Sequence, residues 1–280
     1  MFRAQMYAGI SNTGNTCYVA AVVQCLANCS SFMDALARVG FHRPLHRAMY
    51  ELCVSVLQRR PSSPDALLLL MRKRCSGLIT NFKEPNDSHE FLTDLVAALD
   101  AEAGDETFAR LFLGRSRTST ECTMCRRVVH LVADEAALRV TARGPSAEAV
   151  PVTFETANIN DYRCEGCARV GRAVRESVVT HLPPVIVAHA GEARVRLTDK
   201  LGGVIGANFE LVGAVCRAPG HYYAIVRDGR GSWLLADDEV VTPSHIDTIA
   251  PGAPFLIFLE SRQSQRSRVT PQPIVRVNLA

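Results

Sequence analysis

One stretch, GISNTGNTCYVAAVVQCLANC at positions 9–29, constrains this chain most, because it puts a cysteine at the start of a predicted helix. The residues before the cysteine favour turns: Asn12, Gly14 and Asn15. Positions 18–26 are mostly apolar, so we expect the helix to begin close to Cys17. A thiol there lies near unpaired backbone N–H groups, which lower its pKa and favour the thiolate. The pattern indicates a cysteine nucleophile, whereas the alternative is one buried small side chain among ten cysteines.

Composition limits the classes of protein. The chain has 280 residues, of which 48% are hydrophobic and 21% charged, enough for one large domain or two modest ones. Its formal charge of +3 is small and the basic residues are scattered, so we expect no nucleic-acid partner. The longest dense apolar run, at 66–71, is far too short to cross a bilayer, and the N-terminus carries no secretion signal. We therefore expect an intracellular monomer, cytoplasmic or nuclear, without a membrane partner, whose cysteines serve metal binding or catalysis rather than disulfides.

The two halves of the chain differ in predicted secondary structure. Apolar spacing predicts helices at 32–38, 42–60, 65–75 and 83–100 after the first, with Ser31 capping the second. Alternating or β-branched runs predict strands at 128–132, 174–180, 185–188, 209–216, 222–227, 233–236 and 255–259. We interpret positions 141–152 as a loop, and the polar segment from 261 onward as a disordered tail.

Four cysteines form two CxxC pairs, Cys122 with Cys125 and Cys164 with Cys167. Two such pairs supply the four thiolates of a tetrahedral, structural zinc site with no position left for water. The 38 residues between the pairs exceed the usual gap, so we expect the pairs to lie on separate hairpin tips. A redox pair or a disulfide is the alternative for either CxxC.

A cysteine nucleophile needs a base, and His221 is the histidine at the start of a predicted strand. Asp237 ends the next strand, sixteen residues later, beyond a turn. An antiparallel hairpin brings the two ends together, so the carboxylate can orient the imidazole. The alternative for Asp237 and Asp238 is a solvated strand end.

In these residues the chain resembles the ubiquitin-specific protease family. GISNTGNTCYVAAVVQCL resembles the family's cysteine box, and GHYYAIVRDGRGSWLLADDEVV, from Gly220, resembles its histidine box. Between them, DSHEFL from Asp87, the paired CxxC motifs and LPPVIV from Leu182 resemble three further family motifs in the same order.

The resemblance implies an α+β, papain-like cysteine protease with a helical thumb, a β-rich palm and zinc-bearing β fingers. It implies a catalytic domain over 1–262, with the thumb at about 9–110, the fingers at about 112–185 and the palm at about 186–262, followed by the disordered tail 263–280. Ubiquitin and ubiquitinated proteins are the implied partners, and structural Zn²⁺ is the implied cofactor. The implied reaction is thiol-dependent hydrolysis at the C-terminal glycine of ubiquitin.

The resemblance also assigns roles. Cys17 is the implied nucleophile, His221 the base, Asp237 the orienting acid and Asn12 an oxyanion-hole donor, with Asp238 supporting the hole or the histidine. The implied substrate contacts are Asp87, Glu90, Gly220 and Tyr222, of which Asp87 corresponds to an acid that holds a basic residue of ubiquitin's tail.

The chain departs from the family at several positions. Ala20 and Ala21 replace an Asn-Ser pair, Pro85 and Asn86 replace two glutamines, and the loop 217–220 is shorter than usual. These departures leave open a protease of a ubiquitin-like modifier or a ubiquitin-binding pseudoenzyme. A zinc-ribbon adaptor with an inert Cys17 is a further alternative.

Overall fold

The helices come first, as expected. The computed structural model describes residues 7–73, 84–135, 138–143, 148–151, 154–199, 201 and 208–262. Its helices are α1 (Cys17–Ala27), α2 (Ser30–Val39), α3 (Pro44–Leu57), α4 (Asp65–Arg72), α5 (Ser88–Ala103) and α6 (Ala109–Phe112). The predicted helices are confirmed with shifted ends, and α6 was not predicted.

Two predicted helix starts were wrong. Helix α5 begins at Ser88 because Asp87 is its N-cap: the Asp87 Oδ1 accepts the N–H groups of His89 and Glu90 at 2.7 and 3.2 Å. Ser31 does not cap α2 but lies inside it, after the N-cap residue Cys29. The predicted start at Lys83 and the end at Cys75 lie outside the described residues.

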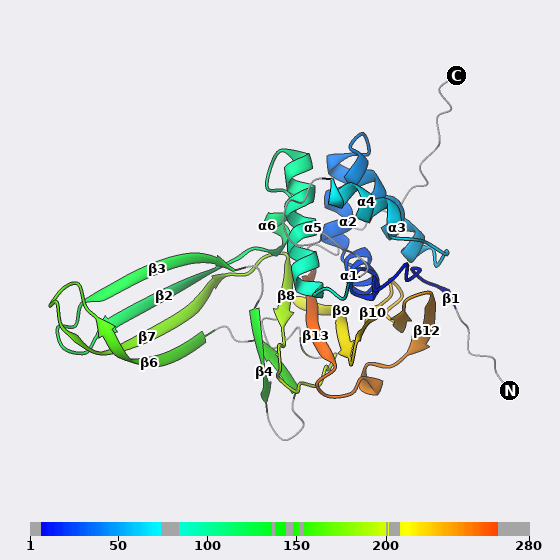
Figure 1. The fold of residues 1–280 in the computed structure, drawn as a ribbon. Coiled ribbons are helices and arrows are strands. Elements are labelled where there is room, and N and C mark those ends of the chain that lie inside the picture. The colour runs from blue at the N-terminus through cyan, green and yellow to red at the C-terminus, as the bar shows by residue number, and fades with distance from the viewer. Residues whose placement is uncertain are drawn as a thin grey trace.

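Helix α1 is the central helix of the domain. All of its residues are buried, and Figure 1 places it between the other helices and the strands of the large sheet. No single described helix is long and apolar enough to cross a bilayer. Helices α1 and α2 pass such a test of length and composition only as a pair, which is bent by 89°.

The large sheet has the strand order β1-β12-β11-β10-β9-β13-β8-β4-β5 among the described residues. Its strands are β1 (Tyr7–Ala8), β4 (Leu138–Arg143), β5 (Glu148–Pro151), β8 (Val185–His189), β9 (Phe209–Ala218), β10 (His221–Arg227), β11 (Trp233–Asp237), β12 (Val240–Ser244) and β13 (Pro254–Ser261). One face packs on the helices, and the other covers a second apolar cluster that includes Leu197, Trp233 and Ile249. Burial on both faces explains the nearly continuous apolar runs of these strands.

The second sheet is antiparallel, with the order β3-β2-β7-β6. It contains β2 (Gly114–Cys122), β3 (Val128–Glu135), β6 (Phe154–Arg163) and β7 (Val170–His181), and it projects away from the rest of the domain (Figure 1). Strands β2 and β6 were not predicted, because few apolar side chains alternate in a sheet that faces water on both sides.

The expectation of a loop at 141–152 was wrong. Strands β4 and β5 pair antiparallel within it, from Val140 opposite Pro151 to Arg143 opposite Glu148, and β4 adds to β8 in parallel. Of the residues that suggested a loop, Pro151 lies in β5, whereas Gly144, Pro145 and Ser146 lie outside the described residues. The predicted tail, 263–280, lies outside the described residues.

Candidate active site

Cys17 is the first residue of α1, at the end of a loop that Asn12 organises. The Asn12 Oδ1 accepts the backbone N–H groups of Thr16 at 3.1 Å and Gly14 at 3.2 Å. Gly14 and Asn15 turn the chain with φ values of 115° and 54°, which explains the turn-forming residues at these positions. The loop therefore holds the thiol at a defined helix end.

The expected low pKa of Cys17 was wrong. Its side chain is only 8% exposed, and this burial raises the pKa of the thiol above 9.0. Hydrogen bonding from the backbone N–H of Tyr222 and of Tyr18 lowers the pKa, and the Asp238 carboxylate raises it, but burial dominates. Burial therefore favours the thiol over the thiolate, so that a base is needed to remove the proton.

His221 and Asp237 meet across the β10–β11 hairpin. The pairing of Ala224 with Ala236 brings the start of β10 level with the end of β11, and the His221 Nε2 lies 2.6 Å from the Asp237 Oδ1. Cys17 lies next to this pair, because its thiol contacts the backbone N–H of Tyr222, the residue that follows His221. With Nε2 held by Asp237, Nδ1 is the ring nitrogen left for the thiol.

Asn12 joins the cysteine loop to the acids after β11. Its Nδ2 donates to the Asp238 Oδ2 at 2.9 Å, and its backbone N–H donates to the Glu239 Oε1 at 3.0 Å. Burial raises the pKa of Asp238, while the hydrogen bond from Asn12 lowers it. The Asp238 Oδ1 is buried without a hydrogen-bond partner in the described part of the chain. Glu239 was missed by the sequence analysis, although it directly follows the two predicted acids.

Gly9 allows these two halves to approach closely. Its N–H donates to the Glu239 carbonyl, and the N–H of Ile10 donates to the Asp238 carbonyl, both at 2.9 Å. A Cβ at position 9 would lie 2.1 Å from the Asp238 carbonyl oxygen, so no larger residue fits without moving the backbone. The glycine that opens the cysteine motif thus allows the segment before α1 to pack against the turn between β11 and β12.

Three of the expected substrate contacts, Asp87, Gly220 and Tyr222, lie near the start of β10. The Asp87 Oδ2 lies 3.5 Å from the Tyr222 hydroxyl. Gly220 turns the chain from β9 to β10 with a φ of 71°, and it is exposed, as is Glu90 on the first turn of α5. The structure therefore brings Asp87 and Tyr222 together, and Glu90 contacts Asp87 through its backbone N–H, which donates to the Asp87 Oδ1 at 3.2 Å.

An aromatic and basic cluster beside Asp87 was missed by the sequence analysis. The His189 ring packs against the rings of His89 and Phe255, tilted to the first and edge-to-face with the second, with centroids 5.4 and 4.7 Å apart. The Arg217 guanidinium lies 4.9 Å above the Phe255 ring. Burial, and then the charge of His89, lower the pKa of His189. The position of His189 in a predicted strand suggested only a packing role, because nothing in the sequence indicated that His89 on α5 lies next to it.

The four cysteines of the CxxC pairs converge at the tip of the second sheet, with all four Sγ atoms within 4.8 Å of one another. The Sγ atoms of Cys125 and Cys164 are 3.6 Å apart. A tetrahedral ion with ligands at about 2.3 Å requires sulfur atoms about 3.8 Å apart. The cluster therefore has the composition and spacing to hold one metal ion.

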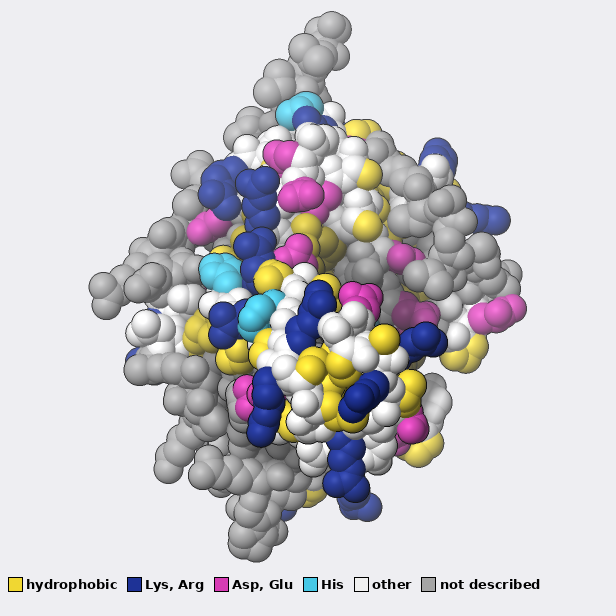
Figure 2. Space-filling view, turned by 90° about the vertical axis from the view of Figure 1, so that its left-hand side faces the viewer, with side chains coloured by type: hydrophobic (Ala, Val, Ile, Leu, Met, Phe, Trp, Pro, Cys, Tyr) yellow, Lys and Arg dark blue, Asp and Glu magenta, His cyan; other side chains and the backbone are white. Residues whose placement is uncertain are grey.

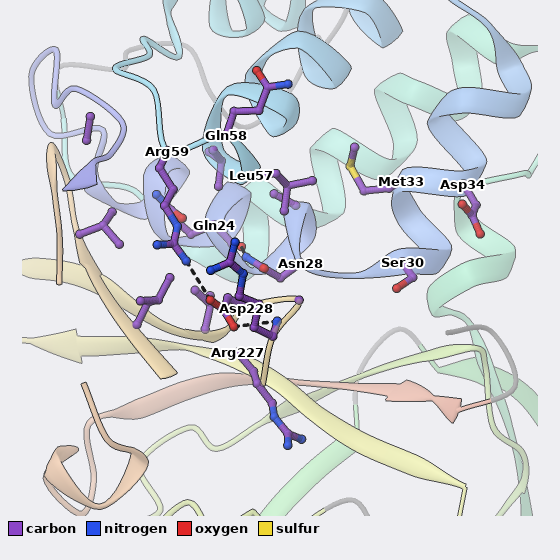
Figure 3. A pocket seen from close by; sticks show the side chains of 18 residues that line it. Gln24, Asn28, Ser30, Met33, Asp34, Leu57, Gln58, Arg59, Arg227 and Asp228 are labelled. Atoms are coloured by element: carbon purple, nitrogen blue, oxygen red, sulfur yellow. Dashed lines mark hydrogen bonds and ion pairs between the residues drawn. The ribbon is translucent and has the colours of Figure 1, made fainter. Parts of the chain in front are cut away.

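A cavity of about 690 Å³ lies at the opposite ends of β10 and β11 from His221 and Asp237. Figure 3 shows Arg59 and Asp228 pointing toward each other at its edge, where they form an ion pair of 2.8 Å. The Arg59 guanidinium also lies 4.0 Å above the Tyr7 ring. These contacts tie α3 to the β10–β11 turn and leave this cavity separate from Cys17.

Comparison with known proteins points to one family. The family model described as ubiquitin carboxyl-terminal hydrolase matches residues 8–202. Ubiquitin carboxyl-terminal hydrolase 25 of Arabidopsis thaliana is 22% identical over 92% of this chain and 48% of its own length. Ubiquitin carboxyl-terminal hydrolase 17-like protein 6 of Homo sapiens is 22% identical over 91% of this chain and 74% of its own length. The chain thus spans about half the length of the first of these relatives.

A solved structure has the same fold. The SAGA DUB module of Ubp8, Sgf11, Sus1 and Sgf73 bound to monoubiquitin contains a chain that matches with a TM-score of 0.73 and 16% identity. The match covers 94% of this chain and 72% of the other. The α+β architecture expected from the sequence is therefore confirmed.

Proposed function

Because the chain belongs to the ubiquitin carboxyl-terminal hydrolase family, we propose that it is a cysteine protease that cleaves the bond at the C-terminal glycine of ubiquitin. The observation that carries the proposal is the His221–Asp237 contact of 2.6 Å beside a cysteine at the start of α1. A packing cysteine has no need of an oriented imidazole next to it.

The reaction begins with proton transfer from Cys17 to the Nδ1 of His221, while the thiolate sulfur attacks the glycine carbonyl carbon. Asp237 stabilises the imidazolium from the other side of the ring through Nε2. The imidazolium then gives its proton to the departing amine, and a thioester remains on Cys17. Water, deprotonated by His221, hydrolyses the thioester and frees the thiol.

The oxyanion forms beside the N-terminus of α1, where the backbone N–H of Cys17 can donate to it. Asn12 is the proposed second donor, with one N–H bonded to Asp238 and the other available for the substrate. Asp238 thereby holds the donor in place. Substitution of one such donor typically costs about 3 kcal/mol of transition-state stabilisation.

The acid Asp87 is the proposed contact for a basic residue in the tail of the substrate. One of its oxygens caps α5 and the other faces Tyr222, so the carboxylate is fixed in direction. Gly220 and Tyr222 line the same end of the cleft, and Glu90 adds negative charge nearby. A ubiquitin-like modifier with a similar tail is the alternative substrate.

Zinc is the proposed ion for the four cysteines, since four thiolates with tetrahedral spacing suit it. With four protein ligands, its role is structural, and it contributes no chemistry to the cleavage. We propose a reducing, intracellular setting, cytoplasmic or nuclear, in which Cys17 and the zinc ligands stay as thiols. Metal analysis of untagged protein should find about one zinc per chain, and none after conversion of Cys125 and Cys167 to serine.

Reaction with ubiquitin that carries a C-terminal electrophile tests the proposal. A covalent adduct is expected with the unaltered protein and none with Cys17→Ala, while Cys25→Ala, which alters a buried cysteine of the same helix, is the matched control and should still react. Binding of ubiquitin without any adduct would favour a pseudoenzyme. Adducts with a ubiquitin-like modifier alone would assign the other substrate.

A further inference from the structure

Strand β3 forms one edge of the projecting sheet, in which it pairs with β2 alone among the described residues. It is eight residues long, from Val128 to Glu135, and contains neither proline nor lysine. Half of its backbone N–H and C=O groups therefore face outward without a strand partner. Exposed edges of this kind are normally shortened, charged or covered.

This edge carries apolar side chains instead. The exposed fractions are 43% for Val128, 42% for Val129, 64% for Leu131 and 58% for Val132. The other edge of the sheet, β6, has the sequence FETANINDYR and is mostly polar. Figure 2 looks onto the free end of this sheet and shows hydrophobic side chains next to several Lys or Arg side chains. The two edges thus differ, and β3 is suited to a partner.

The charge on β3 changes sign along its length. Arg126 precedes the strand and Asp134 lies near its end, and both side chains are well exposed, at 78% and 57%. Their ion pairs, with Glu121 and Arg115, are surface pairs of little strength. An antiparallel partner strand with the same sequence would place its acidic end against the basic end of β3.

A two-fold axis perpendicular to the sheet at His130 gives such a partner a definite register. Residues directly opposite each other share a face of the sheet. The register pairs Val128 with Val132, Val129 with Leu131 and His130 with itself. Arg126, which precedes the strand with a φ of 64°, then lies at the end of the interface where the partner strand brings Asp134. All four exposed apolar side chains then meet another apolar side chain, and the edge hydrogen bonds are completed.

We propose that two copies of this chain associate through β3, forming one eight-stranded sheet from the two projecting sheets. The edge lies well away from α1 (Figure 1), so the association leaves the cleft at Cys17 open and goes beyond the proposed function. It replaces the expectation of a monomer. With one strand from each copy, the interface is small, and the dimer dissociates on dilution.

Sedimentation at increasing protein concentration tests the proposal, first with the unaltered protein and then with variants in which a charge is reversed. The mass should rise from that of one chain, 30.6 kDa, toward twice this value. Arg126→Glu and Asp134→Arg should each weaken self-association by about tenfold, because each places like charges opposite each other. A one-to-one mixture of the two variants, with one of them fluorescently labelled, should associate again, since each variant then meets its complement.

Leu131→Lys should abolish self-association, whereas Asn158→Lys on the exposed β6 edge is the matched control and should not change it. Thermal unfolding of each variant checks that the fold is kept. A constant single-chain mass at all concentrations would overturn the proposal. So would charge variants that associate as the unaltered protein does, or a mixture that fails to associate.

Discussion

Two adjacent acids, Asp237 and Asp238, have different partners in the site. Asp237 contacts the His221 ring, and Asp238 holds the Asn12 amide. Asp238 has a positive φ of 46°, and this turn of the backbone separates the directions of the two side chains. In the proposed mechanism, Asp237 therefore orients the base and Asp238 supports the oxyanion donor.

Asp237→Asn should lower kcat by about 100-fold or more with little change in KM, because an amide cannot stabilise the imidazolium. Asp238→Asn is the matched variant, and its loss should approach that of Asn12→Ala. The double variant of Asp238 and Asn12 should then be little worse than either single one. Steady-state cleavage of a ubiquitin C-terminal amide measures these effects. Equal, additive losses for all three residues would contradict the separate roles.

The raised pKa of Cys17 predicts its reactivity toward alkylation. Below the pKa of a thiol, the thiolate fraction rises tenfold for each pH unit. Since burial raises this pKa above 9.0, the alkylation rate of Cys17 should climb steadily from pH 7 to pH 9. Mass spectrometry of the Cys17 peptide after timed treatment with iodoacetamide gives the rate.

Asp238→Asn should speed this alkylation at a given pH, because the Asp238 charge raises the pKa of Cys17. Glu192→Gln removes an exposed carboxylate that is not among the groups shifting the pKa of Cys17, and it should leave the rate unchanged. A rate that is already constant at neutral pH would instead indicate a thiolate paired with the His221 imidazolium.

At the scale of elements, helix α2 begins against a buried carboxylate from the last strand of the sheet. Glu260 on β13 is fully buried, and its two carboxylate oxygens accept the N–H groups of Ser30 at 3.1 Å and Ser31 at 2.5 Å. The carboxylate therefore accepts the N–H groups that an N-cap side chain normally accepts, and it lies at the positive end of the helix dipole. This contact fixes α2 to the sheet.

Glu260→Ala should lower the free energy of unfolding by about 2–3 kcal/mol, because it leaves buried N–H groups at the helix start without an acceptor. Glu260→Gln should cost less, since its amide oxygen can accept one of them. Urea unfolding measures both variants, and Glu192→Ala at an exposed site is the control. A loss within the range of the control would show that water replaces the carboxylate.

At the scale of the molecule, the projecting sheet has almost no apolar core of its own. Apart from the cysteines, Ala173 is its one fully buried hydrophobic residue among those described, whereas the helices and the large sheet share two extensive clusters. A two-sided sheet in water gains little from burial. The proposed zinc at the four-cysteine site would therefore supply much of the stability at the tip.

Removal of the proposed zinc with a strong chelator should open the projecting sheet selectively. Amide hydrogen exchange should increase over 114–135 and 154–181, while α1 stays protected by its core. The Cys125→Ser variant should behave like the chelated protein without any chelator. Uniform loss of protection, including α1, would mean that the two parts unfold as one unit.

The sequence alone determined the local features of this protein. Turn residues before an apolar helix indicated Cys17, the strand–turn–strand spacing indicated the His221–Asp237 contact, and the CxxC spacing indicated the four-cysteine cluster. Each depends on residues close in the chain or on a fixed ligand geometry. The helices and the buried strands were predictable for the same reason, since burial leaves a periodic apolar pattern.

Only the tertiary structure decided what depends on distant segments. It buries Cys17 enough to reverse the expected direction of its pKa, and it brings Glu239 to Asn12 and Glu260 to α2. The polar strands β2 and β6 of the projecting sheet were also found only in the structure, because strands exposed to solvent on both faces leave no apolar pattern in the sequence. A sequence pattern records which side chains avoid water, but not which distant charge or backbone group becomes their neighbour.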